Sequence, residues 1–138
     1  MTLSPALEET HVKVECDRDI VTARQNGRTM ALQLGFPPAT ATLIATAISE
    51  LARNVLLYAD RGEIVLTPLE QGARRGLAVV ALDQGPGIAD LARAMQDGFS
   101  TSGRLGLGLP GVRRLMDEFE ITSGPGRGTT VTARKWNG

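Results

Sequence analysis

Alternating apolar and polar side chains near the N-terminus predict the first strand. Residues 11–16 alternate in this way, which is typical of a half-buried strand. Asp17 or Asp19 can cap a helix that begins near Ile20, because a short acidic side chain accepts hydrogen bonds from the free N–H groups of a first turn. Gly35 is suited to the end of this helix. The helix carries apolar residues at the spacing of one face, namely Ile20, Ala23, Met30, Ala31 and Leu34.

A second, longer helical pattern covers about residues 39–58. Its apolar residues recur at the spacing of a single helix face. We expect this row to pack against a sheet. The row consists of Leu43, Ala47, Leu51, Val55 and Tyr58.

The remaining pattern predicts paired strands and further helices. Strands are expected at 63–69 and 76–82, joined at a turn containing Gly72. Residues 77–82 are continuously apolar, which is typical of a central strand covered by helices. Hairpins with helices gathered on one face define an α+β fold, here a two-layer α/β sandwich. The other expected elements are a short helix at 88–95, a loop at 96–109, a helix from Pro110 to about Glu118, and strands at 119–122 and 129–135.

Composition restricts the class of protein. The 138 residues fit one domain, expected to span 1–138, and a hydrophobic content of 42% is enough for a packed core. Lys plus Arg and Asp plus Glu both number 15, so no basic excess indicates nucleic-acid binding. No segment approaches the ~20 apolar residues that cross a bilayer, and we expect no membrane association.

Two residues with reactive side chains carry little functional signal. Cys16 is the single cysteine, so it cannot form an internal disulfide, and we expect a reducing, cytoplasmic location. We expect its side chain to be a small buried one and not a reactive thiol. His11 has no neighbour at metal-ligand spacing, and we expect it to lie at the surface.

Glu50 and Asn54 form the first of three patches that suggest chemistry. They lie four residues apart in the second helix, so they share one face. A carboxylate can accept a proton from an attacking hydroxyl group, and an amide oxygen is a suitable ligand for Mg²⁺. The alternative from spacing alone is a solvent-exposed ion pair between Glu50 and Arg53, with Asn54 as an ordinary polar residue.

Asp83-Gln-Gly85-Pro-Gly87 is the second patch, and it follows a predicted strand. The two glycines allow tight turns and the close approach of a planar ligand. An aspartate at a strand end can accept a hydrogen bond from an exocyclic amine such as that of adenine. The alternative is an ordinary Gly-Pro turn.

A glycine run at 103–111 is the third patch. Its backbone N–H groups can surround an anion, and the helix that follows presents an N-terminus that attracts phosphate. The run lacks the Gly-Lys-Ser/Thr of a P-loop, and no strand directly precedes it as in a dinucleotide fingerprint. Hydroxyl groups of Ser100, Thr101 and Ser102 lie just upstream and could contact phosphate. Taken alone, such a run is more often just a connecting loop.

The three patches in this order resemble the sequence boxes of the GHKL ATPase/kinase superfamily. Glu50 with Asn54 resembles its N box, and Asp83-x-Gly85-x-Gly87 its G1 box. Gly106-x-Gly108 resembles the G2 box, and Gly128-Thr129 the final Gly-Thr pair. The resemblance covers about residues 12–135, the expected ordered core. Four longer strings are similar to the switch serine/threonine kinases of bacterial stressosomes, in the anti-sigma-factor kinase branch: 83–88, 97–102, 109–111 and 115–119.

The resemblance implies the Bergerat (HATPase_c) fold, with ATP and Mg²⁺ as cofactors. It implies that Glu50 is the general base, that Asn54 holds Mg²⁺, and that Asp83 binds the adenine amine with Thr129 nearby through water. Gly85 and Gly87 would shape the adenine pocket. Arg104 stands where related kinases place an arginine near the terminal phosphate, with an exposed loop residue as the alternative. The other lid and phosphate residues expected from the glycine run are Gly103, Gly106, Leu107, Gly108 and Gly111.

The function implied by the resemblance is phosphorylation of a protein. The expected substrate is a serine or threonine of a small STAS-domain antagonist protein, and the released kinase would then activate a PP2C-type phosphatase. An anti-sigma factor that sequesters its partner in response to nucleotide is the main alternative. A small ATP-hydrolysing switch without a protein substrate is a third hypothesis. The chain has no helix pair bearing a phosphoacceptor histidine, which disfavours a histidine kinase.

Overall fold

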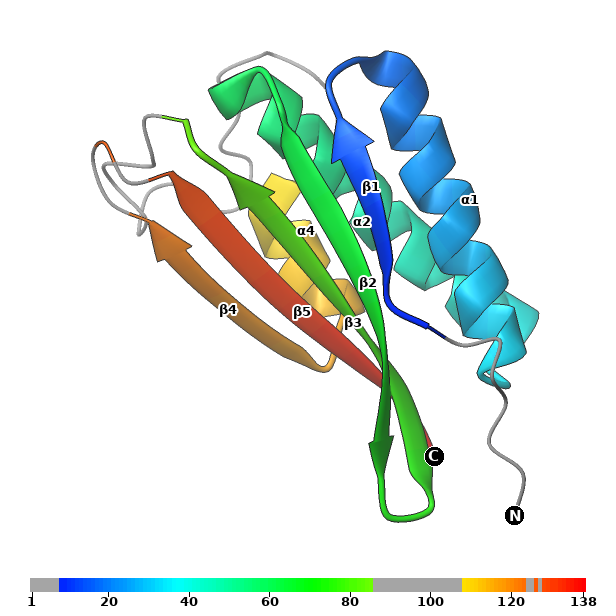
Figure 1. Ribbon diagram of the computed structural model, residues 1–138. Coiled ribbons are helices and arrows are strands. Elements are labelled where there is room, and N and C mark those ends of the chain that lie inside the picture. Colours follow the sequence, from blue (N-terminus) through cyan, green and yellow to red (C-terminus); the bar gives the residue numbers. More distant parts are fainter. Residues whose placement is uncertain (1–7, 86–107, 124–125, 127) are drawn as a thin grey trace.

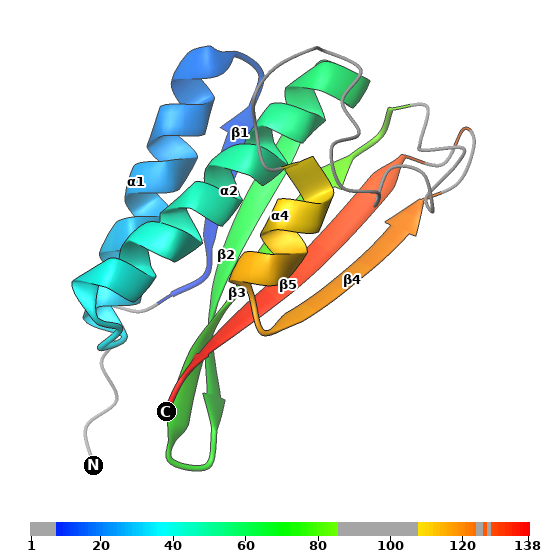
Figure 2. The same ribbon diagram turned by 180° about the vertical axis from the view of Figure 1, so that it is seen from behind.

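The structure is a computed structural model and describes residues 8–85, 108–123, 126 and 128–138. The described strands form one antiparallel sheet in the order β1-β2-β3-β5-β4. Figure 1 shows the sheet, and Figure 2 shows the helices that cover one of its faces. The elements are β1 (Thr10–Val14), α1 (Asp17–Gln33), α2 (Pro38–Ala59), β2 (Gly62–Gln71), β3 (Arg74–Asp83), α4 (Gly108–Leu115), β4 (Glu118–Ser123) and β5 (Thr129–Asn137).

The main core lies between the helical layer and the inner face of the sheet. Ile64 and Leu66 of β2 and Leu77 and Val79 of β3 are fully buried, and they face the helices at every second position. β3 occupies the centre of the sheet between β2 and β5, as its continuous apolar run predicts. The predicted α+β two-layer sandwich is therefore confirmed.

The start of α1 differs from the prediction. Cys16 is the N-cap, and the Asp19 carboxylate accepts hydrogen bonds from the backbone N–H groups of Glu15 at 2.8 Å and Cys16 at 3.2 Å. Asp19 thus accepts these hydrogen bonds from the third position of the helix. Asp17 is the first helical residue and not the cap. Cys16 is exposed, so the expectation of a buried side chain is wrong. The position just outside a helix turns its side chain away from the packed face.

The end of α1 follows the prediction closely. Gly35 has a φ of +91°, a conformation that favours glycine. The Phe36 N–H donates to the Ala31 carbonyl at 3.0 Å, which closes the last turn and brings Phe36 into the core. A sharp reversal then leads into α2.

Most of the predicted row on α2 is buried, because Ala47, Leu51 and Val55 are at most 3% exposed. Ile44 and Ile48 are fully buried, whereas Leu43 is 43% exposed, so Leu43 was wrongly assigned to the packed face. α2 packs against α1 as well as the sheet, which moves the centre of its buried stripe. The two helices are in close contact, because a Cβ added to Gly27 would lie 2.0 Å from the Ile48 Cδ1 atom.

α4 is shorter than predicted. It ends at Leu115 instead of Glu118, and Glu118 already pairs with Arg134 in the sheet. The Lys135 ammonium donates to the Leu115 carbonyl at 2.9 Å and satisfies the helix end. The Asp117 N–H donates to the Arg134 carbonyl at 2.8 Å, which turns the chain into β4. The expected helix at 88–95 and most of the expected loop at 96–109 lie outside the described residues.

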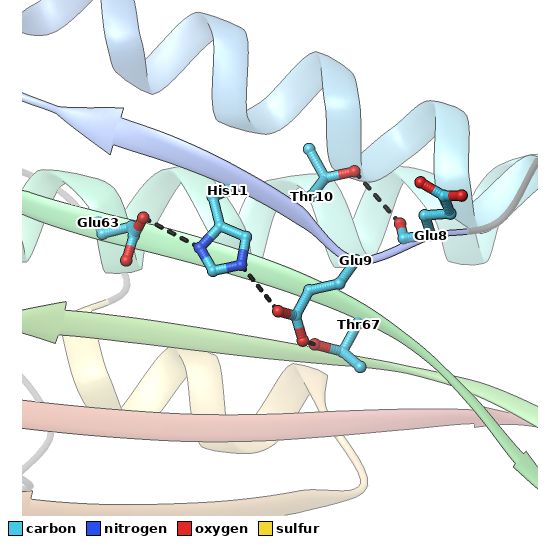
Figure 3. Close-up of polar contacts among 6 residues, drawn as sticks. All are labelled: Glu8, Glu9, Thr10, His11, Glu63 and Thr67. Atoms are coloured by element: carbon cyan, nitrogen blue, oxygen red, sulfur yellow. Dashed lines mark hydrogen bonds and ion pairs between the residues drawn. The ribbon is translucent and has the colours of Figure 1, made fainter.

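His11 is at the surface, as predicted, and it joins β1 to β2 (Figure 3). Its Nε2 atom lies 2.7 Å from a Glu9 oxygen, and its Nδ1 atom lies 3.0 Å from a Glu63 oxygen. These hydrogen bonds, first to Glu9 and then to Glu63, raise the pKa of His11 above its ordinary value of 6.5. No described helix has the length and hydropathy needed to cross a membrane.

Candidate active site

α2 places Glu50 and Asn54 on neighbouring turns next to the sheet. One oxygen of the Glu50 carboxylate accepts a hydrogen bond from the Arg53 guanidinium at 2.5 Å. Its other oxygen accepts from the backbone N–H of Gly108 at 3.3 Å. The ion pair with Arg53 is thus present, but the Glu50 side chain is only 13% exposed and also contacts a second element. Spacing alone could predict the pair and not the contact with Gly108.

Gly108 is the first residue of α4, so its N–H belongs to the positive end of a helix. Its φ of +62° is a conformation that favours glycine. Gly111 is buried in the first turn of α4, within a helix and not a loop. The helix entry predicted near Pro110 is therefore present two residues earlier, and it lies against the helix that carries Glu50.

Asp83 ends β3, and its carboxylate organises the backbone around it. One carboxylate oxygen accepts the N–H of Gly85 at 2.9 Å and the N–H of Thr129 at 3.2 Å. Asp83 and Thr129 are register partners in the sheet. The hydroxyl groups of Thr129 and Ser123 lie 2.8 Å apart, and Ser123 also donates to the Gly128 carbonyl at 3.1 Å. Ser123 was not predicted from the sequence, because only the strand register places it here.

Two glycines beside Asp83 are needed for close packing. A Cβ added to Gly128 would lie 2.2 Å from the Asp83 carbonyl oxygen, and the φ of Gly128 is +74°. A Cβ added to Gly85 would lie 2.5 Å from the Ala59 Cβ atom at the end of α2. Distances below 3.0 Å are not found for real Cβ atoms, so both positions require glycine. The structure thus gives Gly85 a packing role against α2.

A cavity opens between α2 and the sheet where these groups meet. Three of the predicted site residues, Asn54, Asp83 and Thr129, contribute to its wall from three different elements. Its remaining wall is mostly apolar, which suits a planar base. Tyr58 was predicted only as a packing residue. The full lining is Leu51, Asn54, Val55, Tyr58, Ala81, Asp83, Leu109, Thr129 and Val131.

Asn54 has a buried amide nitrogen, Nδ2, without a hydrogen-bond partner among the described residues. Buried polar atoms are nearly always paired, and this one is an N–H donor at the wall of the cavity. The other predicted site residues fall outside the described residues, and their roles stay predictions. They are Gly87, Ser100, Thr101, Ser102, Gly103, Arg104, Gly106 and Leu107.

The fold and the sequence together define the class of this protein. Residues 14–135 match the histidine kinase-like ATPase domain family. The chain belongs to that family. The structure is similar to the mycobacterial sensor histidine kinase MprB, with a TM-score of 0.54 and 13% identity, covering 94% of this chain and 97% of that one. At this identity the likeness concerns the fold alone.

Curated relatives narrow the class further. The chain is 51% identical over 129 residues to serine/threonine-protein kinase RsbT of Bacillus subtilis (strain 168), covering 94% of this chain and 97% of the relative. It is 34% identical over 99 residues to the anti-sigma F factor of Caldanaerobacter subterraneus subsp. tengcongensis, covering 69% of each chain. By this similarity the chain is an RsbT-like protein serine/threonine kinase.

Proposed function

We propose that the chain transfers the terminal phosphoryl group of Mg-ATP to a serine or threonine of a small STAS-domain antagonist protein in the cytoplasm. The observation that carries the proposal is the meeting of Asn54, Asp83 and Thr129 around one cavity. Glu50 lies one helical turn away, against the first residue of α4. The similarity to a relative named as a serine/threonine-protein kinase supports the same activity.

In the proposed complex, the adenine base occupies the apolar part of the cavity. The Asp83 carboxylate accepts a hydrogen bond from the exocyclic amine, and the Thr129 hydroxyl contributes through water. Backbone N–H groups from Gly85 and Thr129 donate to the carboxylate and hold it in place. A base with a donor at this position is therefore preferred over one with an acceptor.

Asn54 is the proposed ligand of Mg²⁺. This ion prefers oxygen and is usually held by one or two protein groups together with substrate phosphates. Among the described residues, no cluster of three His, Cys, Asp or Glu side chains could hold a metal ion. When bound, Mg²⁺ would neutralise part of the negative charge on the phosphate groups.

Glu50 is the proposed general base. The hydroxyl oxygen of the substrate forms a bond to the terminal phosphorus, and the bond from that phosphorus to the ADP oxygen breaks. The hydroxyl proton passes to a carboxylate oxygen of Glu50. Positioning and electrostatics carry most of the catalysis in such a transfer. The N–H of Gly108 at the start of α4 is suited to an anionic group in the same region.

Phosphorylation of the partner is proposed to act as a switch. A phosphate adds a charge of about −1.5 to −2 at pH 7, which disrupts an interface that lacks compensating cations. The released kinase is then proposed to bind and activate a PP2C-type phosphatase. We also propose that residues 100–107 supply lid and phosphate contacts during the transfer. This part of the proposal rests on the family resemblance alone.

Sequestration of a sigma factor is the second candidate function. The observation in its favour is the similarity to an anti-sigma F factor over 69% of the chain. Nucleotide would then control partner binding, and transfer would be secondary. The RsbT relative matches more of the chain at higher identity, which favours the kinase.

The test mixes purified protein with Mg²⁺, radiolabelled ATP and a candidate STAS-domain protein. We expect label on a serine or threonine of the STAS protein, and its loss in Asn54→Ala. Asn26→Ala is the matched control, because Asn26 is exposed on α1. ATP binding without label on the partner would contradict the kinase and favour sequestration. ATP turnover without label would favour a hydrolytic switch.

A further inference from the structure

Arg53 is the cation that pairs with the proposed base. The two side chains lie one turn apart on α2, and the guanidinium Nη1 atom is 2.5 Å from a Glu50 oxygen. Arg53 is 32% exposed and Glu50 is 13% exposed, so the pair lies at the edge of the site and not in open solvent. A partly buried pair of this kind is screened less by water and salt than a surface pair.

The second oxygen of Glu50 faces the N-terminus of α4. It accepts the N–H of Gly108 at 3.3 Å, and this N–H is among the donors best placed for an anion in the region. The carboxylate therefore occupies the position toward which a phosphate group would be attracted. A nucleotide phosphate and the Glu50 carboxylate thus have the same sign of charge and a common donor.

Two like charges at one donor repel each other unless a cation offsets one of them. Arg53 is placed to do so, because it contacts the oxygen that does not face Gly108. The pairing also fixes the direction of the carboxylate, because one oxygen is held and the other is aimed at the start of α4. Arg53 thus orients the Glu50 carboxylate and also offsets its negative charge.

We propose that Arg53 is a positioning residue that directs the Glu50 carboxylate and compensates its charge, so that the terminal phosphate of ATP can approach the start of α4. This inference rests on the proposed function. It predicts that removal of the Arg53 guanidinium lowers the affinity for ATP more than the affinity for ADP. ATP carries its extra phosphate toward Glu50, whereas ADP lacks that phosphate.

The experiment measures the affinities of the full chain for a non-hydrolysable ATP analogue and for ADP, both with Mg²⁺. For Arg53→Met we expect the affinity for the ATP analogue to fall about tenfold, equivalent to about 1.4 kcal/mol. The affinity for ADP should change by less than about threefold. Arg53→Lys should retain most of the affinity for the ATP analogue, because it restores the positive charge.

A double variant separates charge compensation from a general packing defect. Glu50→Gln/Arg53→Met removes the uncompensated carboxylate, so its affinity for the ATP analogue should return to that of Glu50→Gln alone. Arg24→Met is the matched control. Arg24 is exposed on α1, and the substitution removes the same charge and the same type of side chain. It should bind both nucleotides like the unaltered chain.

Equal losses for the ATP analogue and ADP in Arg53→Met would overturn the inference, because a packing defect affects both. No loss for either nucleotide, or no recovery in the double variant, would overturn it as well. In these three cases the unaltered chain still binds ATP, and the proposed function stands. Failure of the unaltered chain to bind ATP would overturn both the inference and the proposed function.

Discussion

The two glycines at 126 and 128 allow a matched test of how the Gly-Thr turn holds the site. Both have positive φ angles, +75° at Gly126 and +74° at Gly128. No described atom would meet a Cβ on Gly126 within 4 Å, whereas a Cβ on Gly128 would lie 2.2 Å from the Asp83 carbonyl oxygen. Alanine at Gly126 therefore tests the backbone conformation alone. Alanine at Gly128 tests the same conformation together with a collision against the backbone.

The expected magnitudes follow from these two terms. A positive φ costs a residue with a Cβ about 1–2 kcal/mol, and alanine recovers about 0.4–1 kcal/mol by restricting the unfolded chain. Gly126→Ala should thus lower the free energy of unfolding by about 1.5 kcal/mol or less. The collision at Gly128 adds about 1–3 kcal/mol, for a total of about 1–4.5 kcal/mol. This loss is a large fraction of the ~5–15 kcal/mol typical of a domain.

Urea unfolding of both variants measures the difference, and nucleotide binding shows its effect on the site. Gly128→Ala displaces Asp83 and the neighbouring Thr129, so it should also weaken nucleotide binding, whereas Gly126→Ala should not. The reasoning is refuted if the two variants lose equal stability. It is also refuted if Gly128→Ala keeps full stability and full nucleotide affinity.

Two further predictions concern Asp83 and the His11 cluster. Asp83→Ala should destabilise the chain by about 1–3 kcal/mol, because the N–H of Thr129 loses its acceptor. Asp83→Asn keeps an acceptor oxygen, so it should lower the free energy of unfolding in urea by less, while still weakening adenine binding. Equal losses of stability in the two variants would contradict this account. The pKa of His11 is raised by Glu9 and Glu63, so its stabilising effect is fully present below its ordinary value of 6.5 and is lost as pH rises through the raised pKa. The pKa of Glu9 is lowered mainly by His11, so that contribution is lost only as pH falls through the lowered value. The difference in thermal unfolding between the unaltered chain and His11→Gln should be largest below the ordinary value of 6.5 and should shrink as pH rises through the raised pKa. A difference independent of pH would exclude this role.

The sequence predicted those parts of the fold that depend on local pattern. Gly35 ends α1, and the apolar run at 77–82 forms the central strand, because local backbone preference and burial agree there. Leu43 was misassigned because periodicity identifies an apolar face without showing which side of it packs against α1. Cys16 was misassigned because average burial of cysteine does not apply to a helix cap.

The candidate site was predicted less completely than the fold. Asp83 and Thr129 are brought together by sheet register, which the family resemblance implied and the residue pattern alone did not. The contact between Glu50 and Gly108 joins residues 58 positions apart, and no local pattern indicates such a pairing. The packing role of Gly85 likewise depends on how α2 ends against β3. Long-range placement is the part that required the structure.

The most direct test of the central claim is a paired measurement on Glu50→Gln. Glutamine keeps the shape of the side chain and cannot accept the hydroxyl proton. We predict that ATP binding is retained or tightened, while transfer of the terminal phosphate to the proposed STAS-domain substrate falls by about 100-fold or more. Transfer at the rate of the unaltered chain would contradict the assignment of Glu50 as the base.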